Sequence, residues 1–386
     1  MNIFAKPALT FIASYLVLSF NSVSKKQSDI INGDLKPMPK IQAAILLDVS
    51  NSMDGLIEQA KAQLWTMVNT LGKAKCEGIT PNIEIALYEY GRDENSRAQG
   101  YVKQISPFTL DLDKLSEDLF SLSTHGGQEY CGQVIYTSLK ELSWDNYASS
   151  YKVIFISGNE DFLQGNISYT LACKEAAEKG VIVNTIYCGD RMQGIREHWN
   201  LLGECGNGNF SNINSNAGPE DIPTPYDSSL ITLNWKLNDT YVYFGEKGKQ
   251  KYASQYKADS LNFAINGYVS ANRVVAKGNS GLYFNAGWDL VDAASNDKDI
   301  LEKLDLKTLP DSVRQLSKKE LQGYIDDKAV QRKAIQNEIL SINAKREKFI
   351  AEERKKNVSG SKDSNLESEI QKMILEQGKR FNLKFE

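Results

Sequence analysis

The pattern of apolar and polar positions is clearest at Ile41–Leu47, where an apolar run ends abruptly in Asp48, Ser50 and Ser52. The run is continuous rather than alternating, which is typical of a strand buried on both faces of a parallel sheet. After Asp54, apolar side chains recur three and four positions apart, so an amphipathic helix is predicted to follow the strand. Ligand sites in open α/β sheets lie at such strand ends, which makes this strand end the first candidate site.

The same alternation of strand and helix patterns continues along the chain. Further strands are predicted at residues 82–90, 101–105, 151–156 and 181–187, with a short one near residue 210, and helices at residues 112–122, 133–142 and 171–179. Strands that alternate with helices predict an α/β fold with a mostly parallel central sheet flanked by helices.

The spacing Asp-x-Ser-x-Ser has a chemical interpretation. On a tight turn, alternate residues point the same way, so Asp48, Ser50 and Ser52 would present one carboxylate and two hydroxyls to a common point. Such oxygen ligands suit Mg²⁺ or Mn²⁺, and less well Ca²⁺. The alternative is helix capping, because Ser, Asn and Asp also close helix N-termini. The strand, the turn at Gly55 and the helix around the motif favour the ion site.

This segment resembles the first metal-site motif of the von Willebrand factor A (VWA) domain family. The resemblance implies a Rossmann-like domain from about Lys40 to about Ile213. It also implies a divalent ion held by Asp-x-Ser-x-Ser, a Thr from a second loop and an Asp after a later strand. Asp48, Ser50 and Ser52 match the first motif without departure. Mg²⁺ is the expected ion, with Mn²⁺ and Ca²⁺ as alternatives.

The second loop departs from the family pattern Gly-Gly-Thr-x-x-Gly. Aligning the chain on Gly132 and the helix after it places Glu129 at the Thr position, whereas aligning it on Gly126 places Gln128 there. Thr124 comes too early in either register. Neither register supplies the expected hydroxyl.

A second departure follows the strand at residues 151–156. The family ends this strand in Thr-Asp-Gly, but this chain has Ser157-Gly158-Asn159, so the expected Asp is Gly158. One carboxylate is therefore lost here and another, Glu129, is gained on the second loop, which conserves the formal charge of the site. We predict that Asp48, Ser50, Ser52 and Glu129 hold the ion. The alternative is a loop that keeps its shape by hydrogen bonds and holds no ion.

The amino terminus has the layout of a secretory signal. Lys6 precedes a 13-residue apolar run, Ala8–Phe20, and small polar residues follow it. That run is short for a membrane-spanning helix, which needs about 20 residues. We therefore predict a signal peptide over residues 1–24, a linker over residues 25–39, and a periplasmic or extracellular protein. An uncleaved membrane anchor is the alternative.

The five cysteines are an odd number, so at least one is predicted to be free or paired with another chain. Cys188 ends a predicted strand and Cys205 follows one short helix, which makes them the first candidate disulfide. No Cys-x-x-Cys motif is present, so a zinc knuckle and redox catalysis have little support.

The chain continues well beyond the VWA-like region, which is predicted to span residues 40–220. Residues 221–310 are expected to form a mixed, mostly helical extension, and residues 311–386 an amphipathic helical hairpin or coiled-coil tail. In that tail, Ile335, Ile339, Ile342 and Phe349 keep helical spacing, with Arg346 interrupting the stripe. Self-association through these helices is one possible role.

The expected function is binding rather than catalysis. The net charge of −4 gives no general case for nucleic acid as a partner. By its resemblance, the chain is expected to be a non-enzymatic envelope or secreted adhesion protein that recognises a protein or cell-surface partner through a variant, MIDAS-like metal site. In detail the chain resembles exported bacterial VWA-domain proteins with a helical carboxyl-terminal region. The alternatives are a metal-free structural scaffold and a metal-dependent hydrolase.

Overall fold

The computed structural model describes residues 40–218, 221–357 and 366–385. The predicted signal peptide and linker lie outside the described residues. Among the described residues, no helix combines the length and apolar character needed to cross a bilayer.

A six-stranded sheet forms the centre of the α/β part, in the order β4-β3-β1-β5-β6-β7. All neighbouring strands are parallel except β4, which pairs antiparallel with β3. The strands are β1 (Lys40–Asp48), β3 (Asn82–Tyr90), β4 (Val102–Thr109), β5 (Tyr151–Gly158), β6 (Ile182–Cys188) and β7 (Phe210–Ile213). This is the predicted fold class, and the continuous apolar run of β1 lies at the centre of the sheet.

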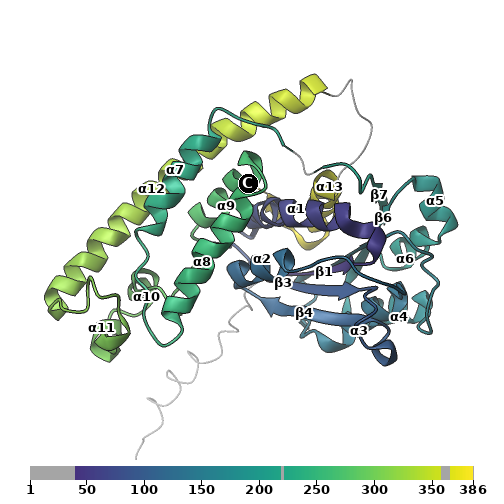
Figure 1. Cartoon of the computed structure of the whole chain (residues 1–386), viewed down its shortest axis with the longest axis horizontal. Helices are drawn as coiled ribbons and strands as arrows, with labels where there is room; N and C mark the ends of the chain where they lie inside the picture. Colours follow the sequence, from purple (N-terminus) through teal and green to yellow (C-terminus); the bar gives the residue numbers. More distant parts are fainter. Residues whose placement is uncertain (1–39, 219–220, 358–365, 386) are drawn as a thin grey trace, which may run out of the picture. The chain divides into compact units, whose positions relative to one another are not determined.

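Helices cover both faces of this sheet (Figure 1). One face packs against α1 (Asp54–Gly72) and α2 (Leu112–Phe120). The other packs against α3 (Cys131–Glu141), α4 (Tyr169–Lys179) and α6 (Trp199–Cys205), and α5 (Arg191–Arg196) lies beside α6. Successive β1 residues point to opposite faces, so Ala43 joins the first core and Ala44 the second.

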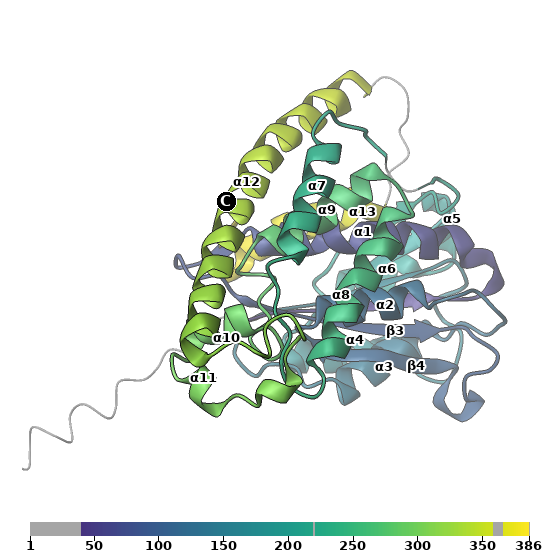
Figure 2. The ribbon, with the colours of Figure 1, turned by 60° about the vertical axis from the view of Figure 1, so that its left-hand side comes forward.

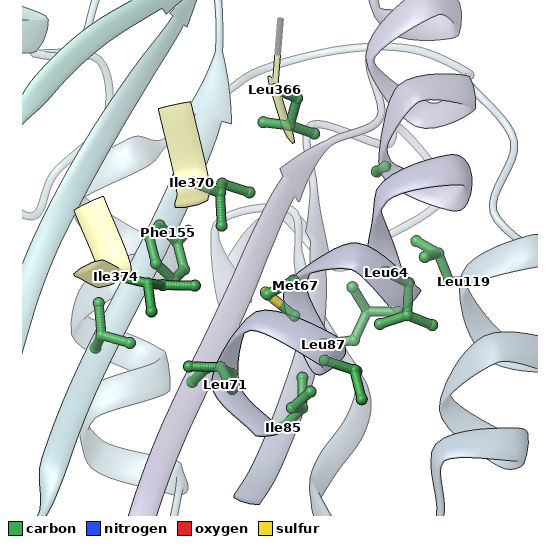
Figure 3. Close-up of a cluster of buried hydrophobic side chains, with 14 of the residues drawn as sticks. Leu64, Met67, Leu71, Ile85, Leu87, Leu119, Phe155, Leu366, Ile370 and Ile374 are labelled. Carbon is green, nitrogen blue, oxygen red and sulfur yellow. The ribbon is translucent and has the colours of Figure 1, made fainter. Parts of the chain in front are cut away.

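The last helix of the chain, α13 (Leu366–Gly378), completes the first face of the sheet. Its buried side chains Leu366, Ile370 and Ile374 lie among those of α1 and the sheet strands, as Figure 3 shows. After α13, strand β8 (Leu383–Phe385) pairs antiparallel with β2 (Ala74–Cys76), the short strand that follows α1 in the sequence.

The other helices lie in the sequence between β7 and α13, so they form an insertion into the α/β part. They are α7 (Asp227–Asn238), α8 (Gly248–Phe263), α9 (Gly267–Gly278), α10 (Leu290–Asn296), α11 (Ile300–Lys303) and α12 (Lys318–Asn357). Helix α9 packs on α1, and α8 packs on α2. The Trp65 indole of α1 donates a buried hydrogen bond of 2.8 Å to Asn262 of α8. The described residues therefore belong to one compact unit.

The structure differs from the hairpin or coiled coil predicted for residues 311–386. Both predicted helices exist, but α12 runs along α7, α9 and α10, whereas α13 packs against α1 (Figure 2). Arg346, which interrupts the apolar stripe, is fully buried and forms a 2.8 Å ion pair with Asp227 of α7. Arg332 is likewise buried and pairs with Asp289 at 2.6 Å. These ion pairs hold α12 where a coiled coil would use apolar side chains.

The predicted disulfide between Cys188 and Cys205 is wrong. Cys205 of α6 bonds to Cys173 of α4, with 5.8 Å between their Cα atoms. Cys188 is a free, buried residue at the end of β6, where its side chain belongs to the core on the other face of the sheet. The two helices that carry Cys173 and Cys205 pack together on the face opposite that core.

A matched pair of substitutions tests whether α13 is part of the sheet core. Ile374 is 0% exposed and the adjacent Leu375 is 41% exposed. Ile374→Ala is expected to lower the free energy of unfolding by about 2–5 kcal/mol, because it opens a cavity under the sheet. Leu375→Ala is expected to change it by less than about 0.5 kcal/mol. Urea denaturation of the full chain measures both. Equal effects of the two substitutions would contradict this packing.

Candidate metal centre

Asp48 lies at the carboxyl end of the central strand β1, with 0% of its surface exposed. Its Oδ1 accepts a 2.7 Å hydrogen bond from the backbone N–H of Ser50, which turns the chain sharply after the strand. A short 3₁₀ turn, Asn51–Met53, then leads into α1. Neither this turn nor α1 receives a side-chain cap at its N-terminus. The hydroxyl of Ser50 is therefore not used for capping, which was the alternative explanation of the motif.

The second loop is fastened to this turn by backbone hydrogen bonds. The N–H of His125 donates to Val49 O at 2.8 Å, and the N–H of Asn51 donates to Gly126 O at 3.1 Å. This arrangement carries Glu129, which is only 4% exposed, to Asp48 and Ser50. Gln128 is exposed and bonds to the Tyr130 hydroxyl instead. Of the two sequence registers, the structure therefore realises the one that places Glu129 in the site.

Gly91, which follows β3, makes room for the two carboxyl groups. Its φ of +86° is in the left-handed region that favours glycine. A Cβ atom at this position would lie 2.9 Å from Asp48 Oδ1 and 3.0 Å from Glu129 Cγ. Any larger residue would therefore collide with the pair.

The Asp48 and Glu129 carboxyl groups are buried together without a compensating cation among the described residues. Burial is the largest effect and raises the pKa of both groups. The Asp48 charge raises the pKa of Glu129 further, and Glu160 raises the pKa of both. The Ser50 side chain hydrogen-bonds to both groups, which acts in the opposite direction.

Two carboxylate oxygens in this pair have no hydrogen-bond partner in the described part of the chain. They are Asp48 Oδ2 and Glu129 Oε2, and both are buried. Buried oxygens of this kind are costly unless a donor or a cation satisfies them. The Ser50 and Ser52 hydroxyls lie 3.4 Å apart beside the pair, and Ser52 also contacts the Asn159 amide. The residues present therefore fit a hard divalent cation such as Mg²⁺.

The described residues contain no group of three or more His, Cys, Asp or Glu side chains arranged to hold a metal. The cluster at β1 has two such residues and completes its oxygen set with serine hydroxyls. That Asp48, Ser50, Ser52 and Glu129 bind an ion thus stays a prediction.

The packing at the end of β5 leaves little room for the aspartate that the resemblance led us to expect at residue 158. A Cβ atom on Gly158 would lie 2.5 Å from the Tyr90 hydroxyl oxygen and 3.1 Å from Asp48 Oδ2. The Tyr90 hydroxyl donates a 3.0 Å hydrogen bond to Ser157 O and so occupies this space. Sequence reasoning missed Tyr90 and Asn159 as neighbours of the site. Their positions at the ends of the two predicted strands that flank β1 in the sheet are the signal that could have indicated them.

Other polar residues of these loops lie outside the cluster. The Thr124 hydroxyl donates to the Asp54 carboxylate. His125 pairs with Glu94 at 2.8 Å, and His198 pairs with Asp161 at 3.0 Å. In the described part of the chain, neither histidine forms an ion pair with Asp48 or Glu129.

Comparison with known proteins gives matches at the level of structure alone. No family model and no curated protein matches the sequence. Proximal thread matrix protein 1 from the mussel byssus is similar over 45% of this chain and 42% of its own, with a TM-score of 0.34 and 12% identity. Another structure of that protein is described as having a zinc-occupied MIDAS motif.

Two further structures match about the same share of this chain. The SpRpn10 VWA domain is similar over 45% of this chain and 88% of its own, with a TM-score of 0.33 and 14% identity. An aerotolerance-related membrane protein from Bacteroides fragilis is similar over 46% of this chain and 93% of its own, with a TM-score of 0.31 and 17% identity.

The buried carboxyl pair predicts an unusual effect of pH on the metal-free protein. Because folding raises the pKa of Glu129, ionising this group opposes folding, and the free energy of unfolding is expected to fall as pH rises from 5 to 8 in EDTA. Glu129→Gln removes the charge at nearly constant volume. At pH 8 it is expected to raise the free energy of unfolding by about 1–3 kcal/mol, and at pH 5 by much less.

Urea denaturation at the two pH values measures this difference. Glu94→Gln is the control, because Glu94 is an exposed carboxylate that pairs with His125 outside the site. A Glu129→Gln protein that is less stable than wild type at pH 8 would contradict the electrostatic account.

Proposed function

We propose that this protein is a non-enzymatic binding protein of the cell envelope or extracellular space. Its α/β domain would recognise a protein or cell-surface partner through a divalent cation, most simply Mg²⁺. The observation that carries the proposal is the pair of buried, unpartnered oxygens on Asp48 and Glu129. They lie at the carboxyl edge of the central strands, where open α/β sheets bind their ligands.

Asp48 and Glu129 would balance the charge of the ion, and the Ser50 and Ser52 hydroxyls would supply neutral oxygens. When bound, the ion supplies a positive centre that attracts an oxygen atom of the partner. The hydrogen bonds between the second loop and the β1 turn hold these side chains in place before the ion arrives. Such preorganisation reduces the entropy lost on binding.

A binding role is favoured over hydrolysis by the neighbouring residues. The two histidines of the chain, His125 and His198, pair with surface carboxylates rather than with a residue of the cluster. Burial raises the pKa of the Cys131 and Cys188 thiols, which lie close enough to Asp48 to feel its charge, and this disfavours the nucleophilic thiolate.

The export prediction has a structural support in the Cys173–Cys205 disulfide. Disulfides persist in oxidising compartments such as the periplasm and the extracellular space, and are rare in the cytosol. Together with the apolar run at Ala8–Phe20, the disulfide supports an exported protein.

Calorimetric titration of the full chain with Mg²⁺, Mn²⁺ and Ca²⁺ tests the cation site. Wild type is expected to bind at least one of these ions. At an ion concentration of 100 times the dissociation constant, the free energy of unfolding is expected to rise by about 2.7 kcal/mol. The Asp48→Asn variant is expected to show neither heat of ion binding nor stabilisation by the ion, because the substitution removes a charged ligand at nearly constant side-chain size.

Glu94→Gln is the matched control for this titration and is expected to bind like wild type. If wild type gives neither heat nor stabilisation with any of the three ions, the cation site is refuted and a structural scaffold becomes the better account.

A further inference from the structure

The charge around the cluster bears on which chemical group of a partner can reach the ion. Asp48 and Glu129 together carry two negative charges when ionised, which equal the charge of a divalent cation. In the family pattern, the position of Glu129 belongs to a neutral Thr hydroxyl. The formal charge of the site is the same as in that pattern. A carboxylate that binds the ion directly nevertheless donates more charge to it than a hydroxyl at the same position, which leaves less attraction for an anionic ligand.

The inner wall of the site is closed by uncharged groups. Tyr90 and Trp199 fill the space in front of Gly158, and Tyr90 donates its hydroxyl hydrogen to a backbone carbonyl. A ligand therefore has to approach from the outer side, where Ser52 is exposed and Asn159 is partly exposed.

A further negative charge, that of Glu160, acts on the carboxyl pair. Glu160 is exposed. Among the described residues, no Lys, Arg or His forms an ion pair with Asp48, Glu129 or Glu160. A carboxylate brought by a partner would thus meet repulsion without a compensating cation from the described part of this chain.

We propose that the outward-facing position of the ion binds a neutral amide or peptide carbonyl oxygen of a protein partner, and not an Asp or Glu side chain. The Asn159 amide beside Ser52 can exchange hydrogen bonds with a peptide group, which suits this ligand. The inference rests on the proposed function, because it presupposes the bound cation.

Acetate and acetamide are matched probes, since they have nearly the same shape and differ in charge. The full chain is loaded with Mn²⁺, and the relaxation of solvent water protons reports the water molecules bound to the ion. Acetate is expected to displace this water from wild type no more effectively than acetamide. Glu129→Thr restores the neutral hydroxyl and is expected to bind acetate at least about tenfold more tightly than wild type.

Glu160→Gln provides a second variant that leaves the predicted ligands in place. It is expected to raise the affinity for acetate about two- to threefold at low salt, and the gain should vanish at about 1 M salt. Glu94→Gln is the control and should match wild type.

The outcomes separate this inference from the proposed function. If wild type binds no Mn²⁺, both are overturned. If wild type binds Mn²⁺ but acetate displaces the bound water as effectively as in Glu129→Thr, only the neutral-ligand inference is overturned.

Discussion

The contact between the buried carboxyl groups of Asp48 and Glu129 is the constraint on which the functional end of the molecule depends. Each group is unfavourable to bury as an ion, and their proximity makes ionisation of both still more costly. The surrounding structure nevertheless enforces the contact. The central strand fixes Asp48, backbone hydrogen bonds to the β1 turn fix the loop that carries Glu129, and Gly91 leaves space for both. Proteins commonly keep such an unfavourable arrangement of charged groups at functional sites, where a bound ligand can stabilise it.

The helical insertion and the last helix give this site a rigid base. The α1 helix begins just after the Ser-x-Ser turn, and its other surfaces contact α9 and α13. Residues from the end of the chain thereby stabilise the element that follows the site. The buried arginines of α12 form ion pairs with Asp289 and with Asp227 of α7, both within the insertion. The packing of the insertion therefore depends on specific ion pairs as well as on buried apolar area.

The sequence was sufficient for those features that local pattern determines. Continuous apolar runs identified the parallel strands, and the polar residues after β1 identified the site. Long-range partners were not predictable in the same way. Arg346 looked like an interruption because its partner Asp227 is 119 residues away. Cys173 was not chosen for Cys205 because their contact depends on how α4 and α6 pack. The register that places Glu129 beside Asp48 is likewise set by backbone hydrogen bonds between loops that a single sequence does not reveal.

The most direct test of the central claim is a crystal structure of the protein grown with Mn²⁺ and measured at the anomalous edge of manganese. A single anomalous peak is predicted in contact with the carboxylate oxygens of Asp48 and Glu129, at oxygen distances of about 2.0–2.3 Å, with the Ser50 and Ser52 hydroxyls facing it. If there is no peak, and the two carboxyl groups instead share a proton at neutral pH, the claim that this pair exists to hold a cation is contradicted.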